Sequence, residues 1–382
     1  WHMIFCAGHS KIDSGQEMGL MVDIFRQDGM GKFDELLLKL STNPGMMYYL
    51  DNTESHKANL NENYGRELLE LFSLGVGMDE AFNYSEDDVK VCARAFTGWN
   101  IAPSYPPFPH GRSPWEFRFD PADHDSTEKT FLGQTGNWNG EDIIRIVCEQ
   151  PATARFLARH LYNYFVADEP QIPAWRLTPP RDQAAIEAME KAYYDSDHSI
   201  KAMLEVLFNS DFFKDESVRY QKVKNPTEMV VSLLRMTGEF KGYQPGLFEA
   251  SQEPKYMGMD LMNPPTVEGW HTGREWIDSG TLVERINFAS DLLGNTELAG
   301  VRSLVDRLMG LGAKLTPEQF VNACLDLTGP VQVFPDTMTQ LVGHASREGD
   351  LSHGNDAELT DFTRRTGEMF QMIAATAEFQ FE

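Results

Sequence analysis

The sequence predicts an all-α protein, an orthogonal multi-helix domain with a small β-hairpin insertion around residues 115–132. Three observations predict this class. Apolar residues recur at helical spacing along most of the chain, several helix starts carry capping signals, and an alternating pattern is confined to one short stretch. Hydrophobic residues make up 41% of the 382 residues, so we expect a folded globular chain with a buried core rather than a disordered one.

The N-terminal part is expected to consist of amphipathic helices. Apolar side chains at helical spacing predict helices over 15–25 and 33–40. Asn59 is followed three residues later by Glu62, which resembles a capping box, so we expect the next helix to begin there. A further helix should begin after Ser85, because three carboxylates follow it in what would be the first turn.

An alternating pattern then interrupts the helices. Trp115, Phe117 and Phe119 are separated by single residues, which is a period of two, and a second short apolar run covers 130–132. The segment 120–129 lies between them. We therefore expect the two runs to pair as a β-hairpin with a long tip.

Helices resume after this insertion. Pro151 is expected at the first position of a helix, where proline is well tolerated. Asn225, Pro226 and Glu228 together provide an N-cap, a proline at the first position and a capping glutamate. The segment 316–319 repeats this logic, so both places predict well-defined helix starts.

The chain is expected to form a single helical domain over residues 1–382. The proline-rich segment 168–180 is the best candidate for a linker, and it would divide the chain into parts 1–168 and 181–382. The sequence begins at Trp1, already inside an apolar stretch. We therefore expect a fragment or a processed chain.

Charge and cysteine content narrow the class of partner. The chain has 33 Lys and Arg against 58 Asp and Glu, a net charge of −25. This balance argues against binding to nucleic acid or to an anionic membrane surface and favours cationic partners. The four cysteines are far apart and form no CxxC pair, so neither a disulfide framework nor a zinc site is expected, and no cofactor is indicated. No apolar run approaches the ~20 residues needed to span a bilayer.

Longer motifs occur in a defined order along the chain. They are YYLDN at 48–52, NENYGRELLELFSLGVG at 61–77, ARAFTGW at 93–99, KTFLGQTG at 129–136, PATARFLARHLYNYF at 151–165, VKNPTEMVV at 223–231 and NPPTVEGW at 263–270.

In these motifs the sequence resembles the bacterial domain of unknown function 1800 family, and the resemblance covers nearly the whole chain. There are two departures. The family usually has a further helical region before the position of Trp1, so the resemblance implies that the N-terminal part of the domain is missing, and Gly65 stands where the family tends to have alanine. The resemblance implies no defined chemistry. It does imply a periplasmic or secreted location, because relatives often carry export signals. It also implies, as a partner, a protein of a neighbouring phosphatase- and sulfatase-like family.

One expected helix carries the first candidate site residue, Glu67. At ~100° per residue, Glu67 projects between Leu71 and Leu74 on the flank of the apolar face. A carboxylate in that position must find a partner or take up a proton. Glu67 is therefore either part of a buried structural ion pair, with Arg94 or Arg155, or a general acid or base with a raised pKa.

Polar residues beside it form a second group of candidates. Asn61 and Asn63 either satisfy backbone groups at the helix start or orient a ligand. Arg66 is spaced to pair with Glu62 and Glu70 on the opposite side of the helix. It belongs either to a solvated ion-paired stripe or to a ligand site.

The hairpin tip and a later loop supply the remaining candidates. His124 and Asp125 suit proton transfer, but the same pair equally stabilises a turn, and no further residues stand at metal-ligand spacing. Lys129 is placed to pair with Asp125 or to bind an anion. Trp270 lies in the aromatic loop 263–276, which either walls a ligand cleft or packs over the helices.

The sequence contains no Walker loop, GxSxG, HExxH or dinucleotide fingerprint. The first hypothesis is therefore a non-catalytic secreted or envelope-associated accessory protein that binds another protein or a polymer. The alternative is a hydrolase-type enzyme in which Glu67 shares a cleft with His124 and Asp125. A second alternative is a structural cation-binding protein that uses its many carboxylates. Whether the chain is an enzyme stays open at this level.

Overall fold

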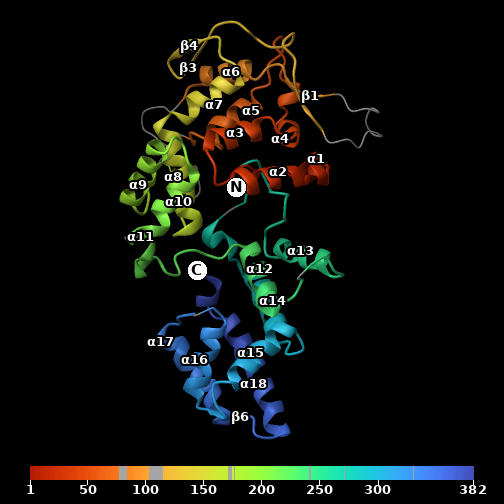
Figure 1. The fold of residues 1–382 in the computed structure, drawn as a ribbon, viewed down its shortest axis with the longest axis vertical. Coiled ribbons are helices and arrows are strands. Elements are labelled where there is room, and N and C mark those ends of the chain that lie inside the picture. Colours follow the sequence, from red (N-terminus) through yellow and green to blue (C-terminus); the bar gives the residue numbers. More distant parts are fainter. Residues whose placement is uncertain are drawn as a thin grey trace. The chain divides into compact units, whose positions relative to one another are not determined.

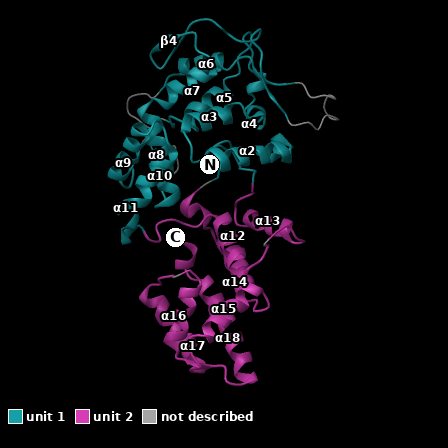
Figure 2. Ribbon diagram, in the orientation of Figure 1, with its two compact units in different colours: residues 1–218, 262–270 teal, residues 219–261, 271–382 magenta. Residues whose placement is uncertain are grey.

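The computed structural model describes residues 1–76, 84–102, 115–170, 174–175, 177–240, 242–270, 272–329 and 331–382. Helices form the bulk of these residues, so the predicted mainly helical class is confirmed (Figure 1). The chain folds into two compact units (Figure 2). Unit 1 comprises residues 1–218 and 262–270, and unit 2 comprises residues 219–261 and 271–382.

Unit 1 contains eleven of the described α-helices and two small β-ladders. The helices are α1 (His9–Ile12), α2 (Gly15–Asp28), α3 (Phe33–Ser41), α4 (Pro44–Tyr49), α5 (Asn63–Glu70), α6 (Glu86–Ala95), α7 (Gly140–Cys148), α8 (Pro151–Phe165), α9 (Gln183–Asp195), α10 (Ile200–Asn209) and α11 (Asp211–Lys214), with 3-10 turns η1 (Asn52–Glu54) and η3 (Glu216–Val218). The antiparallel ladders join β1 (Trp99–Ile101) to β2 (Phe117–Phe119) and β3 (Lys129–Phe131) to β4 (Gln134–Gly136). The described residues of the proline-rich segment 168–180 lie in this unit, whereas 171–173 and 176 are outside the described residues.

Unit 2 is built around the long helices α14 and α18. Its elements are α12 (Pro226–Thr237), α13 (Leu247–Tyr256), η4 (Gly273–Trp276), α14 (Ser279–Gly294), α15 (Ala299–Met309), β5 (Lys314–Leu315), α16 (Pro317–Leu327), α17 (Pro335–Ala345), η5 (Ser346–Glu348), β6 (Leu351–Ser352), α18 (Asp356–Ala374) and η6 (Glu378–Gln380). β5 and β6 pair antiparallel. The buried side chains of α12 and of α14 to α18 form a core of their own.

The helix starts that combine an N-cap with a proline are confirmed. The Asn225 side chain accepts a hydrogen bond from the Glu228 backbone, and the Glu228 carboxylate accepts one from the Asn225 N–H. Thr316 and Gln319 form the same reciprocal box, and Pro151 is the first residue of α8. Both capping boxes satisfy amide groups that a helix start leaves unpaired.

The expected capping box at Asn59 is wrong. α5 begins four residues later, at Asn63, and Glu62 provides no side-chain cap. Asn59 instead pairs with His56, each backbone N–H donating to the other residue's carbonyl oxygen at 2.9 and 3.0 Å. This tight turn uses the backbone groups of Asn59, so the residue is not available to start the helix.

The β-insertion is present, but the two apolar runs do not pair with each other as expected. β2 pairs with β1, and β3 pairs with β4. Leu132 and Gly133 have φ of 45° and 78°, the positive values of a two-residue hairpin turn. Because this turn closes a local hairpin, the segment 120–128 becomes a loop between two ladders instead of a hairpin tip.

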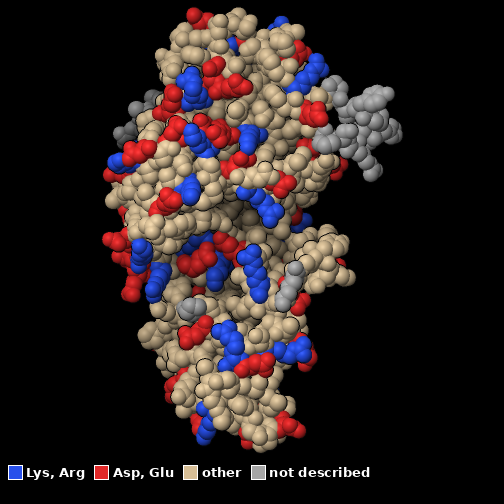
Figure 3. Space-filling model, in the orientation of Figure 1, with Lys and Arg blue, Asp and Glu red and all other residues tan. Residues whose placement is uncertain are grey.

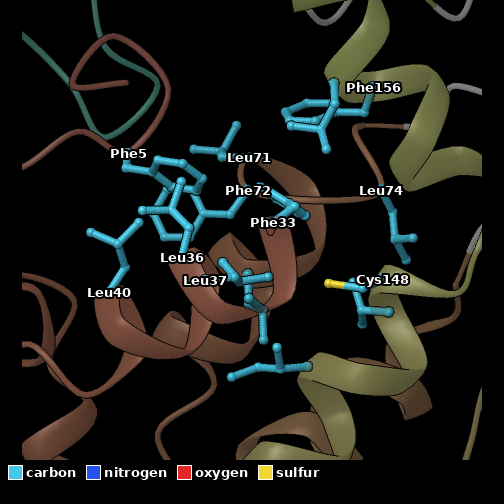
Figure 4. Packing of buried hydrophobic residues seen from close by; sticks show 14 of the residues in the cluster. Phe5, Phe33, Leu36, Leu37, Leu40, Leu71, Phe72, Leu74, Cys148 and Phe156 are labelled. Carbon is cyan, nitrogen blue, oxygen red and sulfur yellow. The ribbon is translucent and has the colours of Figure 1, made fainter. Parts of the chain in front are cut away.

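Aromatic side chains organise the core of unit 1 (Figure 4). The Phe5 ring lies 6.2 Å from the ring of Phe33 and 5.3 Å from that of Phe72, measured between centroids. These contacts tie the N-terminal segment to α3 and to the residues that follow α5. Cys148 lies in the same core, and all four cysteines are buried free thiols.

Acidic and basic side chains are intermixed on the face of the molecule that Figure 3 shows.

The longest helix, α18, has 19 residues but carries the charged residues Arg364, Arg365 and Glu368 within its length. Arg364 alone pairs with three carboxylates, those of Glu348, Asp361 and Glu368. Among the described helices, none is long and apolar enough to cross a membrane.

The Phe5 contacts can be tested by removing one ring. Phe72 is 2% exposed, so Phe72→Ala should leave a cavity and lower the free energy of unfolding by about 3–5 kcal/mol in a urea titration. Met30 of the same unit is 55% exposed, and Met30→Ala should change it by less than about 0.5 kcal/mol. Similar losses for both variants would contradict the packing described here.

Candidate functional site

α5 is held in place by close contact with α6. A Cβ on Gly65 would lie 3.1 Å from the backbone nitrogen of Ala93 and 3.2 Å from the carbonyl oxygen of Val89, tighter than ordinary packing. The glycine therefore lets the two helices approach closely. With α5 fixed in this way, Tyr64 and Leu68 are buried and Glu67 lies beside them.

Glu67 is a buried residue whose carboxyl has no partner among the residues that the structure describes. Its side chain belongs to a residue only 9% exposed, and no hydrogen bond or ion pair reaches it from the described residues. Burial raises the pKa of Glu67 to about 7, and the negative charges of Glu70 and Glu268 act in the same direction, whereas Arg66 opposes them. A group in this state can exchange a proton near neutral pH.

The two arginines expected as partners of Glu67 are engaged elsewhere. Arg94 pairs with Asp125 at 2.7 Å, and Arg155 pairs with Glu190 at 3.0 Å. The prediction of a buried structural ion pair at Glu67 with either arginine is therefore wrong. The physical reason is that α6 directs Arg94 to Asp125 and α8 directs Arg155 to Glu190.

Three chain segments meet near Glu67. Tyr49, at the end of α4, is close enough that the Glu67 charge contributes to raising its pKa, after burial and Cys6. A Cβ on Gly8 would lie 3.2 Å from Asn263 Oδ1 and 3.4 Å from the Tyr49 ring. We call Tyr49, Glu67, Asn263 and Glu268 the Glu67 cluster. Spacing along the chain could not predict it, because about 200 residues separate α5 from Asn263.

The segment 262–270 of unit 1 is held against the N-terminal residues of the same unit by hydrogen bonds. The His9 N–H donates to the Met262 carbonyl at 2.8 Å, and the Ser10 N–H donates to Asn263 Oδ1 at 3.4 Å. Gly269 has φ +95°, and a Cβ there would lie 2.7 Å from Cys6 Sγ. These contacts hold the exposed Glu268 on the same unit as Glu67.

Trp270 closes this segment. It is 6% exposed, and its ring lies 5.3 Å from the ring of His2. Its indole nitrogen is buried and has no hydrogen-bond partner among the described residues. Trp270 thus packs at the end of the segment that carries Asn263 and Glu268.

Asn61, Asn63 and Arg66 make contacts within the protein. Asn61 Oδ1 accepts the Asn63 N–H at 2.9 Å, and Asn63 Nδ2 donates to the Leu50 carbonyl at 3.0 Å. Arg66 forms ion pairs with Glu86 at 2.8 Å, with Glu70 at 3.4 Å and with Glu62 at 3.6 Å. The asparagines thus join the chain before α5 to the end of α4, and Arg66 joins α5 to the start of α6.

His124 and Asp125 are bound to the C-terminal end of α6. His124 Nδ1 donates to the Thr97 carbonyl at 2.8 Å, and the Asp125 N–H donates to Thr97 Oγ1 at 2.8 Å. Arg94 Nε donates to Asp125 at 2.7 Å. Burial by itself would raise the pKa of Asp125, but hydrogen bonds from Arg94 and Thr127 outweigh it and lower the pKa well below its usual range.

Lys129 stabilises the same loop through its buried ammonium group. It is 1% exposed, and its ammonium group donates to the carbonyl oxygens of Asp125 and Thr127. Burial lowers the pKa of Lys129, because the charged ammonium loses its water. A second pair, His56 and Asp123 at 2.5 Å, fastens the other side of the loop.

The predicted site residues therefore fall into two groups. Glu67 lies with Tyr49 and Glu268, whereas His124, Asp125 and Lys129 lie in the loop held by α6. No described hydrogen bond, ion pair or ring contact joins the groups. Within the described ranges, no three His, Cys, Asp or Glu side chains gather in a way that could hold a metal ion.

Comparison with known families agrees with the motifs. A family model described as "protein of unknown function (DUF1800)" matches residues 1–381. The chain belongs to this family. Neither a curated protein nor a solved structure matches the sequence. In this DUF1800 chain, the motifs at 48–52, 61–77 and 263–270 supply the residues of the Glu67 cluster.

Tyr49, Asn263 and Glu268 were not among the predicted site residues of this DUF1800 chain. They lie within YYLDN and NPPTVEGW, two of the motifs on which the resemblance rests. Their position in these motifs was the one signal that could have found them, because a motif that packing does not require is a reason to suspect a site. The motifs alone, however, do not show which of them meet in space.

The pH dependence of stability tests the state of Glu67. A carboxyl with a pKa near 7 in the folded chain and 4.5 as its ordinary value holds its proton more tightly when folded. Its contribution to stability is present below about pH 4.5 and is lost as the pH rises to about 7. Glu67→Gln cannot ionise, so its melting temperature should rise relative to the parent protein over this interval. Glu62→Gln, on the exposed side of the helix start, should not reproduce the change; a pH-independent difference for Glu67→Gln would contradict the assignment.

The loop of His124 and Asp125 is tested at Arg94. Arg94→Met removes donors to Asp125, to the Thr127 hydroxyl and to the Glu128 carbonyl. The free energy of unfolding should fall by about 1.5–3 kcal/mol, because a partly buried carboxylate loses its charged donor. Amide exchange in 123–128 should accelerate. Arg145→Met breaks exposed pairs only and should cost less than about 0.5 kcal/mol, so equal losses would refute the anchoring role of Arg94.

Proposed function

We propose that this DUF1800 protein is a non-catalytic binding protein of the cell envelope or of the secreted space, and that a partner binds at the Glu67 cluster. One observation carries the proposal. Glu67, a residue only 9% exposed whose carboxyl lacks a partner in the described residues, lies where polar groups from separate segments gather. Leaving such a group unpaired costs stability, so its retention is more readily explained by a ligand than by folding.

The chemistry of the cluster favours a cationic group. Glu67 and Glu268 are acceptors when ionised, and the amide oxygen of Asn263 and the phenol oxygen of Tyr49 add further acceptors. An ammonium or guanidinium group supplies several donors and keeps both carboxylates charged. The net charge of −25 further favours a basic partner surface by steering it toward the chain.

We propose as partner a protein of the phosphatase- and sulfatase-like family whose genes neighbour those of DUF1800 relatives. It would place a Lys or Arg side chain at the Glu67 cluster. Support for this choice is the family resemblance together with the acceptor character of the cluster. The loop of His124 and Asp125 supports a non-catalytic function, because its polar groups already form hydrogen bonds with Thr97, Arg94 and Lys129.

Calorimetric titration of the DUF1800 chain with the purified partner tests this proposal. Glu67→Gln and Glu268→Gln should each weaken binding about tenfold, the loss expected when one charge-assisted hydrogen bond is replaced by a neutral one. Glu62→Gln is the matched control and should bind as the parent protein does, because Glu62 is occupied with Arg66. Unchanged affinity in both cluster variants, at unchanged melting temperature, would exclude the cluster as the binding site.

Acid–base catalysis at Glu67 is the second candidate function. The observation that favours it is the pKa of about 7, which suits a group that gives and takes protons near neutral pH. The two candidates differ in one measurement. Hydrolysis of phosphate or sulfate esters by the purified chain, abolished by Glu67→Gln at unchanged stability, would establish the enzyme and reject the binding protein.

A further inference from the structure

A groove of about 570 Å³ runs along α18 in unit 2. Its volume lies within the range of about 300–1,000 Å³ typical of ligand sites. Thr360, Arg364, Glu368 and Gln371 line it from α18, three or four residues apart, and therefore share one face of the helix, with Thr363 at the edge of that face. From Thr360 to Gln371 this face extends for about 16 Å.

Two glycines shape the floor of the groove. A Cβ on Gly294, the last residue of α14, would lie 2.1 Å from Gln371 Nε2, and a Cβ on Gly367 would lie 3.2 Å from the Gly294 carbonyl oxygen. Their absence lets the end of α14 approach α18. The Gln371 amide can then lie across the end of α14 and donate to the Ser290 carbonyl at 3.2 Å.

The groove presents mainly acceptors. The Thr360 hydroxyl donates to the Asp356 carbonyl at 2.8 Å, and the Thr363 hydroxyl donates to the Leu359 carbonyl at 2.9 Å. Each hydroxyl has thus used its only hydrogen and keeps its lone pairs for a ligand. Gln371 likewise keeps its amide oxygen, since the bond to Ser290 uses the nitrogen.

Charges at the rim disfavour an anion. Arg364 is the cation of the groove, and it pairs with Glu368 at 2.8 Å and with Glu348 and Asp361 at 2.5 Å each. Arg365 also pairs with Asp361, at 3.7 Å, so three carboxylates meet two guanidinium groups beside the groove, and an anionic ligand would have to compete with these carboxylates for Arg364. A ligand for this groove should therefore be rich in donors and carry no negative charge.

We propose that this groove is a second binding site, and that it takes a strand of a neutral oligosaccharide. Sugar hydroxyls supply donors along the whole length of a strand, which matches a row of acceptors about 16 Å long. An extended peptide matches less well, because its N–H groups point alternately to opposite sides. The proposal is independent of the Glu67 cluster, since every residue of the groove belongs to unit 2.

Titration of the full chain with cellohexaose, maltohexaose and the hexamer of N-acetylglucosamine tests the proposal. At least one should bind, and Thr360→Val with Thr363→Val should weaken its binding about tenfold, because two acceptors are lost without a change in side-chain shape. Thr339→Val on α17 is the matched control: its hydroxyl also donates one turn back, to the Pro335 carbonyl at 2.8 Å, and it should have no effect.

A second variant separates loss of the site from loss of the fold. Thr363→Trp should fill the groove and abolish binding, while the melting temperature stays that of the parent protein. The proposal is overturned if none of the three sugars binds at millimolar concentration, or if binding survives both the valine pair and the tryptophan. It is likewise overturned if a basic or neutral peptide competes for the groove more strongly than any of the sugars.

Discussion

The close packing of α5 on α6 is the constraint on which the rest of unit 1 depends. Gly65 removes the side chain that would hold the two backbones apart, and Phe72 then enters the aromatic core beside Phe5 and Phe33. Because an α-helix presents residues three and four apart on one face, burying Tyr64 and Leu68 also draws Glu67 into the interior. The burial of Glu67 is thus a consequence of core packing, and the lack of a partner among the described residues distinguishes it from Glu70 of the same helix, which pairs with Arg66.

Polar groups in unit 1 follow two different patterns. In the loop 120–128, charged and hydroxyl groups pair with one another and with backbone carbonyls, so the loop is fixed at the end of α6. Around Glu67 the polar groups meet without satisfying the carboxyl. Hydrogen bonds between protein groups contribute only modestly to stability, whereas an unsatisfied buried group costs more. The satisfied polar groups of the loop 120–128 are therefore explained by folding alone. The unsatisfied carboxyl of Glu67 is instead what a binding site would contain.

Glycines set the geometry at both proposed sites. Gly8 and Gly269 allow the segment 262–270 to approach the N-terminal segment, and Gly294 with Gly367 allows α14 to approach α18. A Cβ on Gly269 or Gly294 would collide with Cys6 or Gln371, and a Cβ on Gly8 or Gly367 would make a tight contact of 3.2 Å. Because glycine has no side chain, two distant parts of the chain can approach closely enough for their acceptors to contact one ligand. The glycine loses more conformational entropy on folding than another residue would.

Local physics explains what the sequence by itself determined. The helical class and the helix starts at Asn225 and Thr316 follow from hydrogen bonds that span three or four residues, and these form whatever the rest of the chain does. Asn59 failed as a start because its backbone pairs with His56, a contact that competes with the helix. The strands β2 and β3 of the β-insertion were recognisable, but their partners β1 and β4 were not predicted, and the turn at Leu132 and Gly133 paired β3 with β4.

The tertiary structure alone decided the environment of each candidate residue. The flank position of Glu67 followed from helical spacing, yet its neighbours Tyr49 and Glu268 come from the end of α4 and from a segment some 200 residues away. Arg94 could have paired with Glu67 as far as spacing shows, but the fold of the 120–128 loop gave it Asp125. Long-range pairing depends on which apolar faces pack together, and that choice is made by the whole core at once rather than by any one segment.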